Sequence, residues 1–266
     1  MRPNELKALM EKYGSRPNKK LGQHFLCDEL ILSTIAAHVM GDRVLEIGPG
    51  TGALTRLLAA NPTRRLVVWE KDPRFQDLLK DTLPQVEWNE GDALDIPWLD
   101  FAGFSVASNL PYNISVPLML TYAQQAMGGF LGPAVLMMQK EVAMRVCAKV
   151  NTADYGRLSV MMQTFCTIEW VVNVPPSAFW PQPAVDSTVL KITPRTPSIQ
   201  VSWDALSVTV EKAFARRRKM LHHNVSLTLE QWQHVDIDRT RRAETLSIEE
   251  FARLALLCQR PQACVP

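Results

Sequence analysis

Residues 42–62 read DRVLEIGPGTGALTRLLAANP, and this stretch joins a strand pattern, a glycine-rich turn and a helix pattern. The apolar side chains of Val44, Leu45 and Ile47 predict a buried strand. Glycines let the backbone approach a ligand closely, and the helix that follows offers free N–H groups in its first turn. The stretch therefore predicts a nucleotide-type binding loop, although G-x-G-x-G at 48–52 differs from the G-x-G-x-x-G pattern of NAD-binding proteins.

The chain around this loop alternates between strand-like and helix-like segments. Further strands are expected in RLVVWEKD, QVEWNEGDAL, FSVASNLPY and the first part of GPAVLMMQKEVAMRVCAK. Helices are expected before and between them, in ELILSTIAAHVM, PRFQDLLKDTL and VPLMLTYAQQAM. Strands that alternate with helices of this length predict an α/β fold of Rossmann type, a parallel sheet with helices on both faces.

The C-terminal part of the chain has a different pattern. LSVMMQTFCTIEWVVNVP (158–175) and DSTVLKITP (186–194) are predicted to be β-rich, with the proline-dense PPSAFWPQP between them. After PRTPS the pattern becomes helical, and the longest predicted helix is DALSVTVEKAFARRRKMLHHNV. We place a domain boundary near residue 197, which gives a ligand-binding domain over 1–197 and a small helical domain over 198–266.

Polar side chains follow the second, third and fourth predicted strands. Glu70 ends the second strand, twenty-two positions after Gly48, and this is the offset of a carboxylate that accepts hydrogen bonds from ribose hydroxyls. Asp92 follows the third strand, where it can accept from the exocyclic amine of an adenine, and Asn109 follows the fourth. Because open α/β sheets bind ligands at the carboxyl ends of their strands, the sequence predicts an adenosine-containing ligand at this edge.

Residues 109–112, Asn-Leu-Pro-Tyr, come directly after the fourth predicted strand. A polar amide, a rigid imino acid and an aromatic ring fill a core poorly, but they suit a flat, nitrogen-bearing ligand. The alternative is a plain turn, for which Asn and Pro are common residues. The position of the segment, in register with the loop and the two acids, favours the binding interpretation.

These motifs resemble those of known methyltransferases. E-x-G-x-G-x-G at 46–52 is similar to class I S-adenosylmethionine-dependent methyltransferases, and N-L-P-Y resembles the N/D-P-P-Y signature of enzymes that methylate exocyclic amines. Four further stretches narrow the resemblance to the ribosomal RNA adenine N6-dimethyltransferases: KKLGQHFL (19–26), YGRLSV (155–160), PPSAFWPQPAVDSTV (175–189) and RRRKML (216–221). The similarity covers nearly the whole chain.

The resemblance implies that S-adenosylmethionine is the methyl donor and that the reaction needs no metal. It implies one set of cofactor-binding residues: His24, Leu26, Gly48, Gly50, Glu70, Asp92 and Asn109. His24 is a departure, because many members carry Asn there, but a side chain that can hydrogen-bond is retained. Glu46 either binds the cofactor or braces the loop through backbone N–H groups, and the resemblance favours bracing.

The resemblance also implies a target, the N6 amine of an adenine, whose lone pair is delocalised into the ring. Asn109 Oδ1 and the Leu110 carbonyl can both accept N6–H bonds, which directs the nitrogen lone pair at the methyl group. Pro111 stiffens the turn, and Tyr112 can stack on one face of the base. Phe179 is the family's candidate for the opposite face, with core filling between prolines as the alternative. No strong general base is required, because the proton becomes acidic as the N–C bond forms.

Basic residues gather at the two ends of the chain. Residues 1–26 hold six Lys and Arg against two acids, and residues 195–266 hold eleven against eight, whereas the whole chain carries only +2. This asymmetry predicts contacts with a polyanion at both ends, although solvated surfaces are the alternative. The predicted RNA-binding residues are Lys19, Lys20, Arg216, Arg217, Arg218 and Lys219, with the last four on a helix.

The resemblance implies a substrate and a setting. The substrate is two adjacent adenosines in the loop of the hairpin near the 3′ end of small-subunit ribosomal RNA, each of which receives two methyl groups. The setting is an assembling small subunit. Two other functions stay open: a methyltransferase for large-subunit RNA, as in macrolide-resistance enzymes, and an assembly or RNA-binding factor whose catalysis is secondary. KKLGQHFL and PPSAFWPQPAVDS favour the small-subunit enzyme.

The remaining composition predicts a cytoplasmic protein. The five cysteines are widely spaced and form no C-x-x-C motif, which argues against a disulfide framework or a zinc site and for a reducing compartment. No apolar run reaches the length that spans a bilayer, and the basic N-terminal stretch lacks the apolar middle of a secretory signal. We expect a monomer without a membrane partner.

Overall fold

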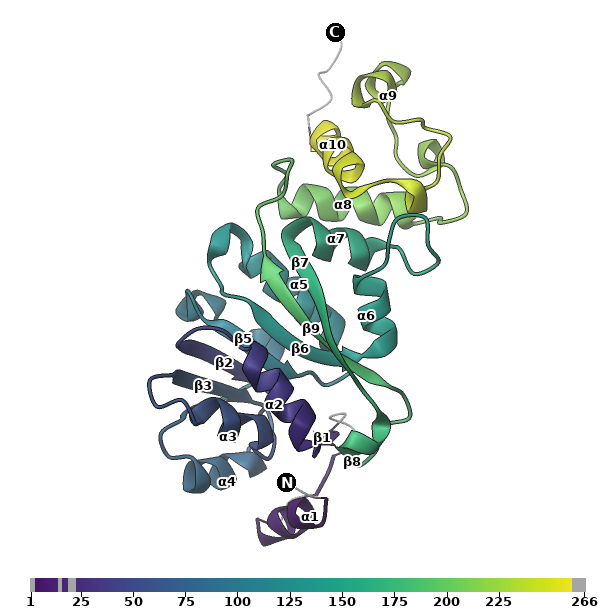
Figure 1. Ribbon diagram of the computed structural model, residues 1–266. Helices are drawn as coiled ribbons and strands as arrows, with labels where there is room; N and C mark the ends of the chain where they lie inside the picture. Colours follow the sequence, from purple (N-terminus) through teal and green to yellow (C-terminus); the bar gives the residue numbers. More distant parts are fainter. Residues whose placement is uncertain (1–2, 14–15, 19–22, 260–266) are drawn as a thin grey trace. The chain divides into compact units, whose positions relative to one another are not determined.

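The computed structural model describes residues 3–13, 16–18 and 23–259. Its central element is a seven-stranded sheet (Figure 1). Across the sheet the strands follow the order β4 (Glu87–Glu90), β3 (Arg65–Glu70), β2 (Arg43–Ile47), β5 (Ser105–Asn109), β6 (Ala134–Gln139), β9 (Ser187–Pro194) and β7 (Cys166–Val174). The first five run parallel, as the sequence predicts. β9 pairs antiparallel with β6, so the complete sheet is mixed.

The strand order places a ligand crevice at the centre of the sheet. From β2 the chain moves outward through β3 to β4, then crosses back to β5 and β6 on the other side of β2. The connections run through α3 (Ala53–Ala59), α4 (Arg74–Thr82) and α5 (Ser115–Gln125), and α2 (Glu29–His38) precedes β2. In Figure 1, α2 and α3 lie in front of the sheet and α5 lies behind it. The order reverses between β2 and β5, and open α/β sheets bind ligands at the carboxyl ends beside such a reversal.

The N-terminal segment packs against the sheet domain through a small second core. Helix α1 (Pro3–Lys12) buries Leu6 and Met10 against Phe25 and Phe75. The two-residue strand β1 (Phe25–Leu26) then pairs antiparallel with β8 (Phe179–Trp180). This pairing fixes the backbone just before α2, close to the carboxyl ends of the strands.

The chain divides into two compact units. The first holds Met1–Ala143 and Thr167–Pro194, and the second holds Met144–Cys166 and Arg195–Pro266. The second unit resumes two residues before the boundary that the sequence predicts, but its segment 144–166 is not anticipated by the sequence. Inside the second unit this segment is tied down by two hydrogen bonds, from Tyr155 Oη to the Leu246 carbonyl at 3.0 Å and from the Asn151 N–H to the Glu244 carbonyl at 2.8 Å.

The second unit is helical, as predicted. Its helices are α7 (Arg157–Phe165), α8 (Trp203–Phe214), α9 (Leu229–Val235) and α10 (Ile248–Gln259), and α6 (Lys140–Val146) leads into it. The prediction that residues 158–165 are β-rich is wrong, because they form most of α7. Nearly all of these side chains are buried, so neither a two-residue nor a 3.6-residue period of polar positions marks the segment. The strand prediction holds from Cys166 onward.

The basic run, residues 216–219, does not lie on a helix, contrary to the prediction. Helix α8 ends at Phe214, and residues 215–219 form turns. The side chain of Asn224 donates to the carbonyls of Ala213 and Arg216, at 2.8 and 3.2 Å, which satisfies carbonyl groups at the helix end.

Within the described ranges, no helix is both long and apolar enough to cross a membrane.

Candidate functional site

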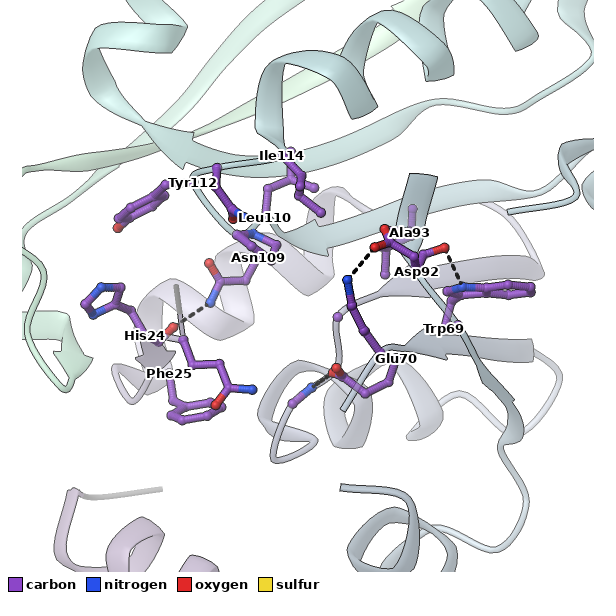
Figure 2. A pocket seen from close by; sticks show the side chains of 18 residues that line it. His24, Phe25, Trp69, Glu70, Asp92, Ala93, Asn109, Leu110, Tyr112 and Ile114 are labelled. Carbon is purple, nitrogen blue, oxygen red and sulfur yellow. Dashed lines mark hydrogen bonds and ion pairs between the residues drawn. The ribbon is translucent and has the colours of Figure 1, made fainter. Parts of the chain in front are cut away.

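A pocket of about 880 Å³ opens at the carboxyl ends of β2, β3 and β5 and at the exit of β4, all within the first unit (Figure 2). Its walls bring together residues from five separate stretches of the chain, including the glycine loop, the two acids and the Asn-Leu-Pro-Tyr segment. The residues that line it are Gln23, His24, Phe25, Ile47, Gly48, Gly50, Trp69, Glu70, Lys71, Gly91, Asp92, Ala93, Asn109, Leu110, Pro111, Tyr112, Asn113 and Ile114. The predicted convergence of the strand ends is therefore observed.

The glycine loop is held in an open conformation by the neighbouring strand. Gly48 and Gly50 have φ angles of 69° and 52°, which side chains with a Cβ rarely adopt. The Gly48 N–H donates to the Trp69 carbonyl at 2.9 Å, and the Gly50 N–H donates to Glu70 Oε2 at 3.1 Å. A Cβ on Gly50 would lie 2.9 Å from the ring of Phe25. The loop therefore brings bare backbone to the wall of the pocket.

Glu70 is buried at the end of β3 and has both carboxylate oxygens engaged. Oε2 accepts from Gly50 N and Oε1 accepts from Asp72 N at 2.9 Å. Burial away from water raises the pKa of Glu70 above its ordinary value, although these backbone N–H bonds oppose the shift. Each oxygen keeps a second lone pair, so the carboxylate can still accept a hydroxyl hydrogen from the pocket.

Asp92 lies across the pocket from Glu70 (Figure 2). Its Oδ1 accepts from the Leu94 N–H at 3.0 Å, and its Oδ2 accepts from the ammonium of Lys71 at 2.6 Å. The hydrogen bond from the Leu94 backbone lowers the pKa of Asp92, and Lys71 lowers it further. Asp92 is therefore a carboxylate at neutral pH, with an orientation set by the turn that it caps.

The orientation of the Asn109 amide is determined by the N-terminal segment. Asn109 Nδ2 donates to the His24 carbonyl at 3.0 Å, which leaves Oδ1 as the oxygen available to a ligand (Figure 2). The next residue is fixed by its backbone, because the Leu110 N–H donates to the Met137 carbonyl at 3.0 Å and the Leu110 side chain is buried. The turn that follows closes with a bond from the Ile114 N–H to the Pro111 carbonyl at 3.1 Å.

Tyr112 and His24 form an aromatic side of the pocket. The two rings stack with centroids 5.6 Å apart and planes inclined by 23°. The Tyr112 hydroxyl lies 2.8 Å from Ser187 Oγ, and burial raises the pKa of this phenol above its ordinary value. His24 Nδ1 lies 2.7 Å from the Pro181 carbonyl, and because a carbonyl only accepts, this nitrogen carries the hydrogen. The Tyr112 ring is thus held by Ser187 on β9, and the His24 ring by the Pro181 carbonyl between β8 and β9.

Two predicted site residues lie in the core and not at the pocket. Leu26 and Phe179 pair with each other between β1 and β8, and both are buried in the same apolar cluster. Phe179 is only 2% exposed. Phe179 thus packs in the core as the structure stands, and its role in stacking on the base stays a prediction. Lys19 and Lys20 lie outside the described residues.

Nine residues that line the pocket are missing from the predicted set: Gln23, Phe25, Ile47, Trp69, Lys71, Gly91, Ala93, Asn113 and Ile114. Gln23 and Phe25 flank His24 in the GQHFL stretch, so the motif itself contained the signal. Gln23 Nε2 donates to Asp72 Oδ2 at 2.9 Å, which ties the N-terminal segment to the end of β3. Lys71 follows Glu70 directly, and an exposed lysine after a strand carries no signal that distinguishes it from solvated surface.

The bracing contacts predicted for Glu46, from backbone N–H groups of the loop to its carboxylate, are not observed among the described residues. Glu46 is 2% exposed, and its Oε2 has no hydrogen-bond partner within the part of the chain that the structure describes. Burial, with the nearby charge of Glu70, raises the pKa of Glu46 to about 8. Glu46 is therefore protonated at neutral pH, beneath the glycine loop and outside the pocket wall.

The basic run of the second unit splits into two pairs. Arg216 donates to Asn224 Oδ1 and to the His223 carbonyl, and Arg217 donates to Glu244 Oε2 at 2.8 Å and to the Thr152 carbonyl at 3.2 Å. Arg218 and Lys219 are exposed, and among the described residues their side chains have no hydrogen-bond or ion-pair partner. Two of these four residues predicted to bind RNA therefore already make hydrogen bonds within the protein.

Comparison with known proteins agrees with this geometry. Residues 14–260 match the family described as ribosomal RNA adenine dimethylase. The chain is 39% identical to the Ribosomal RNA small subunit methyltransferase A of Chelativorans sp. (strain BNC1), over 94% of this chain and 96% of that protein, and 38% identical to the protein of the same name from Legionella pneumophila (strain Lens), over 90% and 96%.

Two solved structures have the same fold over most of the chain. A dimethyladenosine transferase from Plasmodium falciparum superposes with a TM-score of 0.74 at 30% identity, covering 88% of this chain and 96% of that one. The 23S rRNA methyltransferase ErmE superposes with a TM-score of 0.65 at 26% identity, covering 88% and 99%. With a family match over nearly its whole length and the strand-end pocket in place, the chain belongs to the ribosomal RNA adenine dimethylase family.

Proposed function

We propose that this protein transfers methyl groups from S-adenosylmethionine to the N6 amines of two adjacent adenosines in the 3′-end hairpin loop of small-subunit ribosomal RNA. The observation that carries the proposal is the Asn109 amide, whose nitrogen is bonded to the His24 carbonyl so that its oxygen remains for the ligand. An exocyclic amine has two N–H donors, and Asn109 at the end of β5 offers an acceptor for one of them.

The residues at the strand ends suit the donor. The positive φ angles of Gly48 and Gly50 create a backbone cradle, Glu70 retains lone pairs for ribose hydroxyls, and Asp92 offers a carboxylate to an adenine amine. When bound, S-adenosylmethionine supplies an activated methyl group on its sulfonium.

The acceptor side would act by position. Asn109 Oδ1 and the Leu110 carbonyl accept the two N6–H bonds and so favour a pyramidal nitrogen with a directed lone pair. Tyr112 stacks on the base, which is worth roughly 1–3 kcal/mol. Alignment of the reacting atoms supplies on the order of 7–11 kcal/mol of barrier reduction. Because the proton on N6 becomes acidic as the bond forms, Asn109 and Leu110 only need to hold it and release it to water.

RNA binding would involve the second unit as well as the pocket. The target base must leave its stack to reach Asn109, since chemistry on a base requires its extrusion or a single strand. Exposed arginine and lysine side chains such as Arg218 and Lys219 provide phosphate contacts, which give affinity and salt dependence. The same proposal sets the reaction on an assembling small subunit in the cytoplasm, with the protein acting as a monomer.

The experiment is methyl transfer from isotope-labelled S-adenosylmethionine into purified small and large ribosomal subunits from a strain that lacks the gene. We expect label in the small subunit, and nuclease mapping should place it in the 3′-end hairpin as N6,N6-dimethyladenosine. Label confined to the large subunit would reject this substrate in favour of the activity named for ErmE. The relatives at 36–39% identity are named for the small subunit, which supports the first outcome.

A further inference from the structure

The ammonium of Lys71 occupies the carboxylate that the donor's adenine would use. Lys71 Nζ lies 2.6 Å from Asp92 Oδ2, and both residues line the pocket. The pair joins the end of β3 to the exit of β4. The Lys71 side chain is 58% exposed, so it has room to move away.

The other oxygen of Asp92 is hydrogen-bonded to the backbone. Oδ1 accepts from the Leu94 N–H at 3.0 Å and caps the short helical turn at Ala93–Asp95, which fixes the direction of the carboxylate. Oδ2 is therefore the atom presented to the pocket. The hydrogen bond to Asp92 raises the pKa of Lys71, so this neighbour is a full cation at neutral pH.

An adenine amine and an ammonium are both donors. An adenine amine that approaches Oδ2 meets an oxygen that already accepts a hydrogen bond from Lys71. The bound base would also shield the Lys71 ammonium from the water that now solvates it. The amine then either displaces the ammonium from Oδ2 or shares this oxygen with it. In both cases the ion pair lowers the affinity of the site for an adenosine ligand.

We propose that Lys71 sets the affinity for the methyl donor by competing with its adenine amine for Asp92 Oδ2. This inference rests on the proposed function, since it requires that Asp92 receive the donor's adenine. The inference predicts how the affinity for the donor depends on salt. Salt screens the exposed ion pair, so donor affinity rises with ionic strength, whereas RNA affinity falls.

The test is calorimetric titration of the full chain with S-adenosylhomocysteine and S-adenosylmethionine at about 50 and about 300 mM NaCl. Lys71→Met removes the ammonium and keeps most of the aliphatic stem. We expect Lys71→Met to bind about twofold to fivefold more tightly at low salt, the size of an exposed ion-pair contribution. We also expect its affinity to lose the rise with salt.

The matched control is Lys191→Met. Lys191 pairs with Glu169 at 3.7 Å between β9 and β7, and neither residue lines the pocket. Lys191→Met should titrate like the wild type at both salt concentrations. Equal or weaker binding by Lys71→Met would overturn the inference, because the lysine would then be neutral or would assist the adenine.

Asp92→Asn separates this inference from the proposed function. If Asp92→Asn weakens donor binding while Lys71→Met leaves it unchanged, the proposed site stands and only the competition is wrong. If neither the wild type nor Lys71→Met binds the donor, the proposed function fails as well. Tighter binding by Lys71→Met together with weaker binding by Asp92→Asn supports both.

Discussion

The strand-end pocket and the basic turn after α8 treat their polar groups in opposite ways. In the pocket, Asn109 and Glu70 are fixed by hydrogen bonds to the protein itself, and each keeps a lone pair that can accept another hydrogen bond. In the turn, Arg216 and Arg217 are engaged by the fold, while Arg218 and Lys219 extend into solvent. Chemistry at one nitrogen atom needs acceptors at fixed positions, whereas a polyanion needs only mobile charges nearby.

The largest expected effect comes from removing the fixed amide. Asn109→Ala should lower kcat for methyl transfer by about 10²–10³-fold, the loss seen when one preorganised hydrogen-bonding group is removed from an active site. Initial rates with labelled donor and small subunits from a deletion strain measure this. Thermal unfolding should change little, because only the bond to the His24 carbonyl is lost.

The control for this variant is Asn61→Ala, which removes an amide from an exposed turn where Asn61 Oδ1 accepts from Thr63. It should transfer methyl groups at the wild-type rate. The deletion strain provides a second measurement: full maturation of small subunits by a catalytically dead Asn109→Ala protein would show that binding, and not methylation, is its main role.

The second effect divides the basic run. Replacing Arg218 and Lys219 together by Gln should weaken RNA binding roughly tenfold and reduce the slope of log affinity against log salt by about 1.4 to 1.8, because two phosphate contacts are lost. Filter binding across a salt series measures the slope. The melting temperature should stay at its wild-type value, because neither side chain has a hydrogen-bond or ion-pair partner among the described residues.

Replacing Arg216 and Arg217 by Gln changes the same number of charges and serves as the matched comparison. This pair should lower the free energy of unfolding by about 1 kcal/mol, because the contacts to Asn224 and Glu244 are lost. Its effect on the salt slope should be the smaller of the two. Equal slopes for the two double variants would show that the division seen in the free protein does not persist on RNA.

The smallest effect concerns Glu46, a buried residue beneath the glycine loop. Its Oε2 has no hydrogen-bond partner among the described residues. Its pKa is raised to about 8 in the folded protein from an ordinary value of 4.5. The folded state therefore binds a proton that the unfolded state has released, and stability falls as pH rises from 4.5 to about 8. Between pH ~7 and ~9 the loss should be on the order of 1 kcal/mol.

Urea unfolding of the wild type and Glu46→Gln across this pH interval measures the loss, which Glu46→Gln should not show. Glu87→Gln is the control, since Glu87 pairs with Arg65 on the surface and its pKa is lowered by that hydrogen bond. Parallel pH curves for the wild type and Glu46→Gln would mean that Glu46 finds a partner in solution.

The sequence predicts the first unit well, because its strands end in residues with distinct chemistry. Gly48, Gly50, Glu70, Asp92 and Asn109 all meet at one pocket, as the alternation of strands and helices requires. The antiparallel β9 could not be oriented from its pattern, because an apolar strand reads the same in either direction. The site assignments themselves remain predictions until a ligand is measured.

The errors have a common physical origin in burial. Residues 158–165 are apolar on all sides, so no polar face revealed the helix α7. The pairing of Phe179 with Leu26 across β1 and β8 could not be predicted, because it joins residues more than a hundred positions apart in the chain. The end of α8 before the basic run depends on Asn224, whose role appears only in the folded chain.

The grip of the N-terminal segment on Asn109 is made by the main chain of residue 24 and not by its imidazole. Every amino acid has that carbonyl, so substitutions at this position can vary the aromatic wall while the orientation of the acceptor amide is inherited unchanged. Trimming the protein past residue 24 would be a different matter. A shortened chain could retain all seven strands of the main sheet and still be inactive, because it would lack the one carbonyl oxygen that orients the Asn109 amide.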